Sequence, residues 1–136
     1  MDSKHSSICH LTFYECDSIT INYVIGQPTA VISSSGKGVD LPVVGAVLNE
    51  FRSSLGNFIQ VEFSAKITDT SKASESKLLT ACYRYGVLIL EYTDGSKKLL
   101  GTDANPITMN YEKAGTPASF QLSINSLQAE YSKFVL

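Results

Sequence analysis

The chain has 136 residues, 43% of them hydrophobic, and a formal net charge of −2 at pH 7 from 11 Lys and Arg against 13 Asp and Glu. This length and apolar content predict a single folded domain over residues 1–136 and argue against wholesale disorder. The balance of charge gives no basic field to attract phosphate backbones, so direct sequence-specific binding of nucleic acid is not expected.

The three cysteines, Cys9, Cys16 and Cys82, are an odd number. The N-terminal residues 1–18 lack the continuous apolar stretch of a secretory signal, and an odd count without such a signal is not a disulfide framework. No run approaches the roughly 18 apolar residues that a membrane span needs. We therefore expect a protein made in a reducing cytoplasm, with its thiols free and no membrane partner.

The N-terminal third is rich in β-branched and aromatic residues. Residues 10–26 predict two strands, or one strand with a break, dividing near residues 16–18. Residues 27–45 carry two Pro, three Gly and a Ser triplet, which predicts a long irregular excursion with at most a short strand at residues 30–32. The Ser/Gly-rich part, near 33–40, is expected to be flexible. It lacks the Gly-Lys-Ser/Thr ending of a phosphate-binding loop.

The middle of the chain contains one ambiguous and two clear segments. Apolar residues at helical spacing favour a short helix in residues 44–55, ended by Gly56, while a strand pair with a turn remains open. Residues 59–67 alternate strictly and predict a half-buried strand. The next segment, residues 70–82, predicts a helix with Cys82 as a small buried residue and Gly86 as its stop. Its N-cap is one of three polar residues: Asp69, Thr70 or Ser71.

The C-terminal half predicts a β-meander. Residues 87–92 are a nearly continuous apolar run, typical of a central strand, and the Asp94-Gly95 turn leads into a partner strand. Residues 103–106 form a second turn signal, followed by alternating strands near 107–112 and 119–126. The tail, residues 126–136, is predicted to be an edge strand or an extended arm. The fold class expected is therefore α+β, mainly antiparallel β, with one or two short helices.

Candidate chemistry is sparse. The ligand-type side chains His5, Cys9, His10 and Cys16 are close in sequence, but no second pair of ligands accompanies them, so a zinc site is not expected. The two His both precede residue 11, and no nucleophile motif is present. Cys9 and His10 are neighbours that a strand would point to opposite faces. We therefore expect no catalytic residues, no metal and no cofactor, and a binding or assembly role instead of an enzyme.

The chain from residue 86 onward contains a turn-and-strand pattern that precedes a strand near the C-terminus. The residues of this pattern are Asp94, Gly95, Leu99, Leu100, Gly101, Thr102, Asn105 and Pro106. The pattern resembles that of small structural proteins of phages and prophages of gut Bacteroidetes. The resemblance covers the last third to half of the chain.

The resemblance implies a virion part: a head–tail connector, tail-completion or tail-tube-like protein that acts as a ring or tube with itself and other virion proteins. It implies localisation in the virion after synthesis in the bacterial host cytoplasm. A small ligand-binding or adhesion module is the alternative. The tail docks on a neighbouring subunit or packs on its own core, and both remain open. The candidate interface residues are Ser35, Gly36, Lys37, Gly38, Tyr131, Phe134, Val135 and Leu136.

Overall fold

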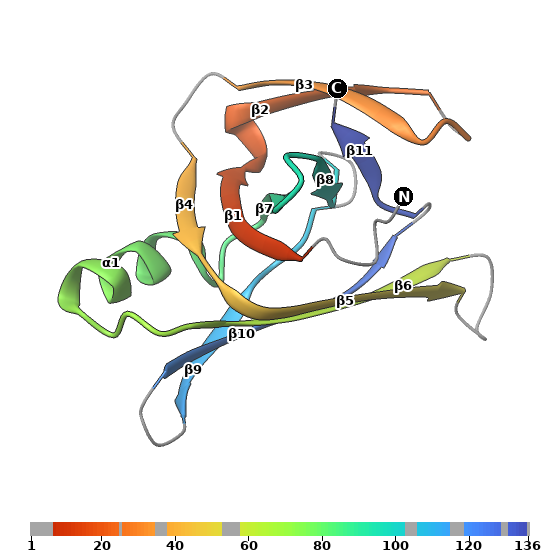
Figure 1. Cartoon of the computed structure of the whole chain (residues 1–136). Coiled ribbons are helices and arrows are strands. Elements are labelled where there is room, and N and C mark those ends of the chain that lie inside the picture. The colour runs from red at the N-terminus through yellow and green to blue at the C-terminus, as the bar shows by residue number, and fades with distance from the viewer. Residues whose placement is uncertain are drawn as a thin grey trace.

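The computed structural model describes residues 7–24, 26–34, 38–52, 58–102, 106–114, 119–128 and 131–135 (Figure 1). These residues contain one α-helix, α1 (Lys72–Ala81), and a 3-10 turn, η2 (Cys16–Ser18). The strands are β1 (Ile8–Glu15), β2 (Ile19–Tyr23), β3 (Thr29–Ser34), β4 (Val39–Pro42), β5 (Val44–Arg52), β6 (Ile59–Ile67), β7 (Gly86–Tyr92), β8 (Lys97–Leu100), β9 (Asn110–Ala114), β10 (Ser119–Gln128) and β11 (Lys133–Val135).

The strands form two sheets. The larger has seven strands in the order β2-β3-β11-β8-β7-β1-β4, and the smaller has four in the order β5-β6-β10-β9. All named strand pairs are antiparallel except β11 with β3, which is parallel. The predicted fold class, mainly antiparallel β with a short helix, is confirmed.

The main core lies between the two sheets and is closed at one end by α1. The strictly alternating strand β6 buries its odd-numbered residues from Ile59 to Ile67 and leaves the even-numbered ones half-buried or exposed, as predicted. Phe120, Leu122 and Ile124 of β10 lie beside them because the two strands pair over nine residues. The burial of this face is the main driving force that holds the sheets together.

A second, smaller core lies on the opposite face of the seven-stranded sheet, where the β2–β3 hairpin folds over β7 and β8 (Figure 1). Strand β7 separates the two cores: Leu88 and Leu90 belong to the main core, and Val87 and Ile89 to the smaller one. A strand buried on both faces needs an apolar residue at every position. This explains the continuous apolar run, and the predicted central strand is confirmed.

The predicted helix at residues 44–55 is wrong; the strand alternative is right, and β5 occupies residues 44–52. Val47 and Phe51, four residues apart, share a face in a helix and also in a strand, so their spacing does not separate the two structures. They are 50% and 43% exposed, whereas Ala46 and Leu48 pack on the core. The strand therefore divides the residues that a helix would have placed on one face: Val47 and Phe51 lie on the outer face and Leu48 on the inner one. The proposed stop, Gly56, lies outside the described residues.

The predicted irregular excursion is also largely wrong. Strand β3 extends over six residues and lies inside the seven-stranded sheet, and β4 pairs with β1. Gly38 precedes β4, and a Cβ there would contact Thr12 Cγ2 and lie 2.8 Å from Tyr14 Cζ. Glycine at residue 38 therefore lets the chain pack closely against the Thr12 and Tyr14 side chains of β1. Residues 35–37 lie outside the described residues.

Helix α1 is confirmed, and Ser71 is its N-cap: the Ser71 hydroxyl accepts a hydrogen bond from the Ser74 backbone N–H at 3.3 Å. The predicted stop at Gly86 is wrong, because the helix ends at Ala81 and Gly86 begins β7. The chain turns instead at Tyr83, which has a φ of +65°. No helix in the described part of the chain has the length and apolar character needed to cross a membrane.

Replacing the cap should weaken the helix measurably. We expect Ser71→Ala to lower the free energy of unfolding by about 1 kcal/mol, because one backbone N–H loses its partner. Thr70→Ala, at an exposed position that does not cap, is the matched control and should change it by much less. Urea unfolding followed by circular dichroism measures both. Equal effects for the two variants would contradict the assignment of the cap.

The C-terminal strands pair as two consecutive hairpins, β7–β8 and β9–β10, but the hairpins belong to different sheets. The Asp94-Gly95 turn is confirmed: Gly95 has a φ of +91°, and the Asp94 carboxylate accepts hydrogen bonds from the backbone N–H and hydroxyl of Ser96. Between the hairpins, Ile107 makes an isolated bridge to Gly86. The meander therefore crosses from one sheet to the other, and β8 pairs with β11, not with β9.

Candidate functional site

The C-terminal strand β11 lies between β3 and β8 of its own chain (Figure 1). Phe134 is opposite Thr29 on β3 and Lys98 on β8. The Phe134 backbone N–H donates to the Pro28 carbonyl at 2.8 Å. Of the two open alternatives for the tail, packing on its own sheet is what the structure contains.

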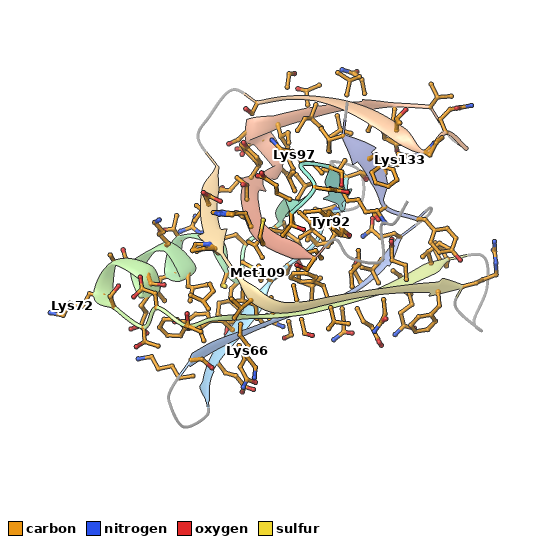
Figure 2. All side chains as sticks on the ribbon, in the orientation of Figure 1. Lys66, Lys72, Tyr92, Lys97, Met109 and Lys133 are labelled. Carbon is orange, nitrogen blue, oxygen red and sulfur yellow. The ribbon has the colours of Figure 1, made fainter. Side chains whose placement is uncertain are left out.

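Side chains fasten the tail to both sheets. The backbone N–H and the hydroxyl of Ser132 each donate to the Glu50 carboxylate at 2.7 Å, which joins the tail to β5. Lys133 is 6% exposed, and its ammonium donates to the Gln27 carbonyl and lies 5.4 Å from the Tyr23 ring (Figure 2). A buried ammonium needs such partners, because desolvation penalises its charge. Residues 132 and 133 therefore bind specific places in the fold.

The predicted interface residues are scattered by the fold. Val135 packs on the smaller core, while Tyr131 and Phe134 are 51% and 45% exposed. The Lys98 ammonium lies 5.1 Å from the centre of the Phe134 ring. Gly38 packs against β1, as described above. Ser35, Gly36, Lys37 and Leu136 lie outside the described residues. The described members therefore make no single surface.

Four strands lie at sheet edges: β2 and β4 in the larger sheet, β5 and β9 in the smaller. The edge of β9 is covered by Tyr83, whose backbone N–H donates to the Met109 carbonyl and whose hydroxyl donates to the Tyr111 carbonyl. Strand β4 carries Pro42 and packs against α1. Strand β2 has only five residues. Proline, short length and covering groups are all devices that block strand addition.

Strand β5 differs from these three edges. It has nine residues, contains no proline or lysine, and exposes Val44, Val47 and Phe51. Its one irregularity is a register shift between Val44 and Val47, where Gly45 has a φ of +62°. From residue 47 to residue 52 it pairs regularly with β6 on one side, and its other side is not hydrogen-bonded to a strand of the described residues.

The outer face of the four-stranded sheet continues this apolar character. Phe51 is opposite Gln60 on β6, and Gln60 is opposite Leu127 on β10. Leu127 is 48% exposed. The rows beside this one carry polar pairs such as Asn49 with Glu62. The face is therefore mixed, and its exposed apolar residues are concentrated on and near the β5 edge. The spacing of the apolar residues in 44–55 favours a helix, so this edge was not predicted from the sequence.

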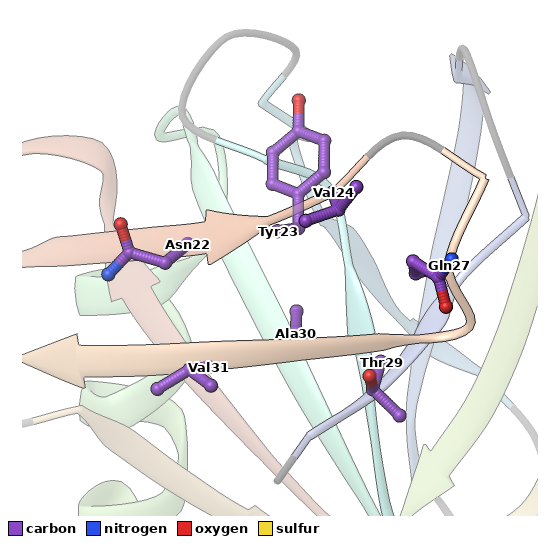
Figure 3. Close-up of a pocket in the computed structure, with 7 residues that line it drawn as sticks. All are labelled: Asn22, Tyr23, Val24, Gln27, Thr29, Ala30 and Val31. Atoms are coloured by element: carbon purple, nitrogen blue, oxygen red, sulfur yellow. The ribbon is translucent and has the colours of Figure 1, made fainter.

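A small hollow of about 320 Å³ lies at the end of the β2–β3 hairpin (Figure 3). Its size is at the lower limit of small-molecule sites. None of its lining residues is charged, so its chemistry favours a small, weakly polar group. The lining residues are Asn22, Tyr23, Val24, Gln27, Thr29, Ala30 and Val31.

The N-terminal candidate ligands are not gathered into a metal cluster in the described part of the chain. His10 Nδ1 lies 3.1 Å from Asp40 Oδ1 on the neighbouring strand. The Cys9 thiol donates instead to the Glu91 carbonyl on β7 at 3.6 Å. His5 lies outside the described residues.

Cys82, Tyr92 and Asp69 are among the titratable groups whose pKa is shifted by their surroundings. Burial raises the pKa of the Cys82 thiol to about 12. Burial also raises the pKa of Tyr92, and the nearby carboxylates of Glu50 and Asp94 raise it further. The pKa of Asp69 is lowered by hydrogen bonds from Ser71. Cys82 is 3% exposed, as the sequence predicts for a small buried residue on the inner face of the helix.

The cysteines should react at very different rates. All three are thiols, and Cys9 and Cys16 are half-buried. We expect iodoacetamide near pH 8 to alkylate Cys9 and Cys16 in the folded protein and to leave Cys82 unmodified, because the thiolate is the reactive form. Peptide mass mapping after alkylation measures this, with urea-unfolded protein as the control in which all three react. Rapid alkylation of Cys82 in the folded protein would contradict its burial.

Comparison with known protein families, curated proteins and solved structures finds no match for this chain.

Proposed function

We propose that this chain is a non-enzymatic structural subunit of a phage virion that assembles with copies of itself and with other virion proteins. The observation that carries the proposal is the nine-residue edge strand β5, which exposes Val44, Val47 and Phe51. From residue 47 to residue 52 this edge is regular, exposes two apolar side chains and contains no proline or lysine, which suits the addition of another strand. The ring or tube, and the role as connector, tail-completion or tail-tube-like protein, come from the family resemblance.

The residues behind the resemblance have structural roles in this fold. Asp94 and Gly95 form the β7–β8 turn, Leu99 packs on the smaller core and Leu100 on the main core. Gly101 has a φ of +84°, a conformation that suits glycine. Asn105 lies outside the described residues. The pattern that this chain has in common with the phage proteins therefore concerns the internal fold. The surface for assembly that we propose lies on β5.

A small ligand-binding or adhesion module is the second candidate, favoured by the hollow at the β2–β3 hairpin (Figure 3). Unlike the assembly proposal, this function predicts that the protein stays monomeric and that substitutions at Tyr23 and Val31 abolish ligand binding. The assembly proposal makes those substitutions neutral for self-association.

Light scattering after size-exclusion chromatography tests the proposal on the full chain, over a wide range of protein concentration. We expect the molar mass to rise above that of the monomer as concentration increases, with closed particles visible by negative-stain electron microscopy. Tyr23→Ser is the control that alters the hollow but not the β5 edge, and it should leave the mass unchanged. A strictly monomeric chain at the highest concentration contradicts self-assembly.

A further inference from the structure

The exposed edge of β5 can pair with a strand of another molecule. We propose that β5 of one copy pairs antiparallel with β5 of a second copy, about a two-fold axis at Asn49, and so joins two four-stranded sheets into one continuous sheet. This inference rests on the proposed function and names the partner and the register of one contact between subunits.

The kind of partner follows from the backbone. An edge strand presents a row of N–H and C=O groups, and another extended strand satisfies them best. At the β9 edge of a second copy, the Tyr111 carbonyl and that of Met109 just before β9 already accept hydrogen bonds from Tyr83, which disfavours a head-to-tail contact with β5. The edge strand β4 ends in Pro42, and the edge strand β2 has only five residues. This leaves a second β5 as the matching strand within copies of this chain.

The side-chain pattern fixes the register. In an antiparallel pair with a two-fold axis at Asn49, Val47 lies opposite the second copy's Phe51, and Phe51 opposite its Val47. Within β5, an axis at Val47 or at Phe51 keeps only one exposed apolar pair, the axis residue with its own copy, and an axis at Leu48 or Glu50 keeps none. The regular part of β5, residues 47–52, begins just after the register shift and contains all the residues that this pairing needs. Cross-strand pairs of aromatic and β-branched residues are favourable units of sheet stability.

The charges on β5 are compatible with this register. Asn49 meets Asn49 of the second copy, and two amides can donate to and accept from each other. Glu50 lies opposite Leu48 of the second copy, so the two carboxylates do not face each other. Each Glu50 carboxylate already accepts two hydrogen bonds from Ser132 of its own chain. A two-fold contact closes on itself, and contacts on other surfaces extend the pair into a larger assembly.

Disulfide trapping tests the register. In a background in which Cys9 and Cys16 are replaced by serine, we expect Asn49→Cys to form a covalent dimer on mild oxidation. Directly opposite Cα atoms in an antiparallel pair are about 4.5–5.5 Å apart, within the range for a disulfide. Thr20→Cys, on the exposed face of edge strand β2, is the matched control and should stay monomeric on a non-reducing gel. Equal cross-linking of the two variants overturns the proposed register.

Charge substitutions separate edge pairing from other contacts. We expect Val47→Lys to weaken self-association at least about tenfold, because it places a charge opposite Phe51 twice in each dimer. Leu127→Lys is the control: it has nearly the same exposure as Val47, 48% against 50%, and lies on the same face, but on the internal strand β10. It should leave association unchanged.

The outcomes distinguish this inference from the proposed function. If oligomers persist in the Val47→Lys variant and Asn49→Cys forms no cross-link, the β5 pairing is overturned. The proposed function then stands, with assembly through another surface. If Leu127→Lys also dissociates the oligomers, the contact lies on the face of the sheet, and this result overturns edge pairing. A wild-type chain that stays monomeric at every concentration overturns both.

Discussion

Gly86→Ala is expected to be among the most destabilising single substitutions in this protein. Gly86 begins β7 and pairs with Glu15 at the end of β1. A Cβ at residue 86 would contact the Tyr14 carbonyl oxygen and lie 2.6 Å from Phe13 Cζ. The Phe13 ring is 2% exposed and is part of the main core, so it has little room to move. Overpacking a core costs about 1–3 kcal/mol and sometimes more.

The backbone contact places Gly86→Ala at the upper end of this range. A side chain can change rotamer, but the Tyr14 carbonyl belongs to strand β1, which pairs with β7 from Ile8 to Glu15. Strand β1 would have to move away from β7 and disturb both cores. We expect a loss of about 3 kcal/mol or more in the free energy of unfolding, which is a large part of the stability of an ordinary domain.

Urea unfolding followed by circular dichroism or tyrosine fluorescence measures this loss, since the chain has seven Tyr and no Trp. Gly26→Ala is the control: a Cβ there meets nothing within 4 Å, but the φ of +87° is strained for alanine. That strain alone costs about 1–2 kcal/mol. A smaller loss for Gly86→Ala than for Gly26→Ala would show that β1 yields easily and would contradict the packing argument.

Removal of the C-terminal residues 131–136 should have the other large effect. Four hydrogen bonds outside the strand ladders are lost: two from Ser132 to Glu50, one from Lys133 to Gln27, and one from Phe134 to Pro28. At about 0.5–1.5 kcal/mol each, they contribute about 2–6 kcal/mol. The edges of β3 and β8 also lose their partner, and Val135 no longer covers the smaller core.

The truncated chain is compared with the full chain by urea unfolding and by native-state hydrogen exchange. We expect a lower midpoint and faster exchange in β3 and β8, with β6 and β10 less affected because they belong to the other sheet. Phe134→Ala is the control that keeps the strand but removes a half-exposed ring, and it should cost much less. Unchanged stability after truncation would favour the alternative in which the tail serves a neighbouring subunit.

The two sheets of the fold differ in how their edges are completed. The seven-stranded sheet is completed internally by its own C-terminal strand, and β1 and β7 are packed too closely to accept a methyl group. The four-stranded sheet keeps one open edge. Assembly through β5 would leave the two cores untouched, so variants at the exposed β5 residues Val47 and Asn49 should change association with little change in stability.

The sequence by itself determined the elements whose signals are local. The period of two in residues 59–67, the apolar run before Tyr92 and the Asp94-Gly95 turn all correspond to observed structure. Helix α1 was also predictable, since its cap residue and inner face lie within a few residues of each other. In each case the alternation, the cap or the turn conformation depends on neighbouring residues alone.

The tertiary structure decided everything that depends on distant partners. Val47 and Phe51 share one face in a helix and in a strand, and only the pairing with β6 made that segment a strand. The tail became a parallel partner of β3, more than a hundred residues earlier in the chain, and β8 paired with it instead of with β9. Such choices follow from which apolar faces can be buried together, and the free energy of that burial is a property of the whole fold and not of any short segment.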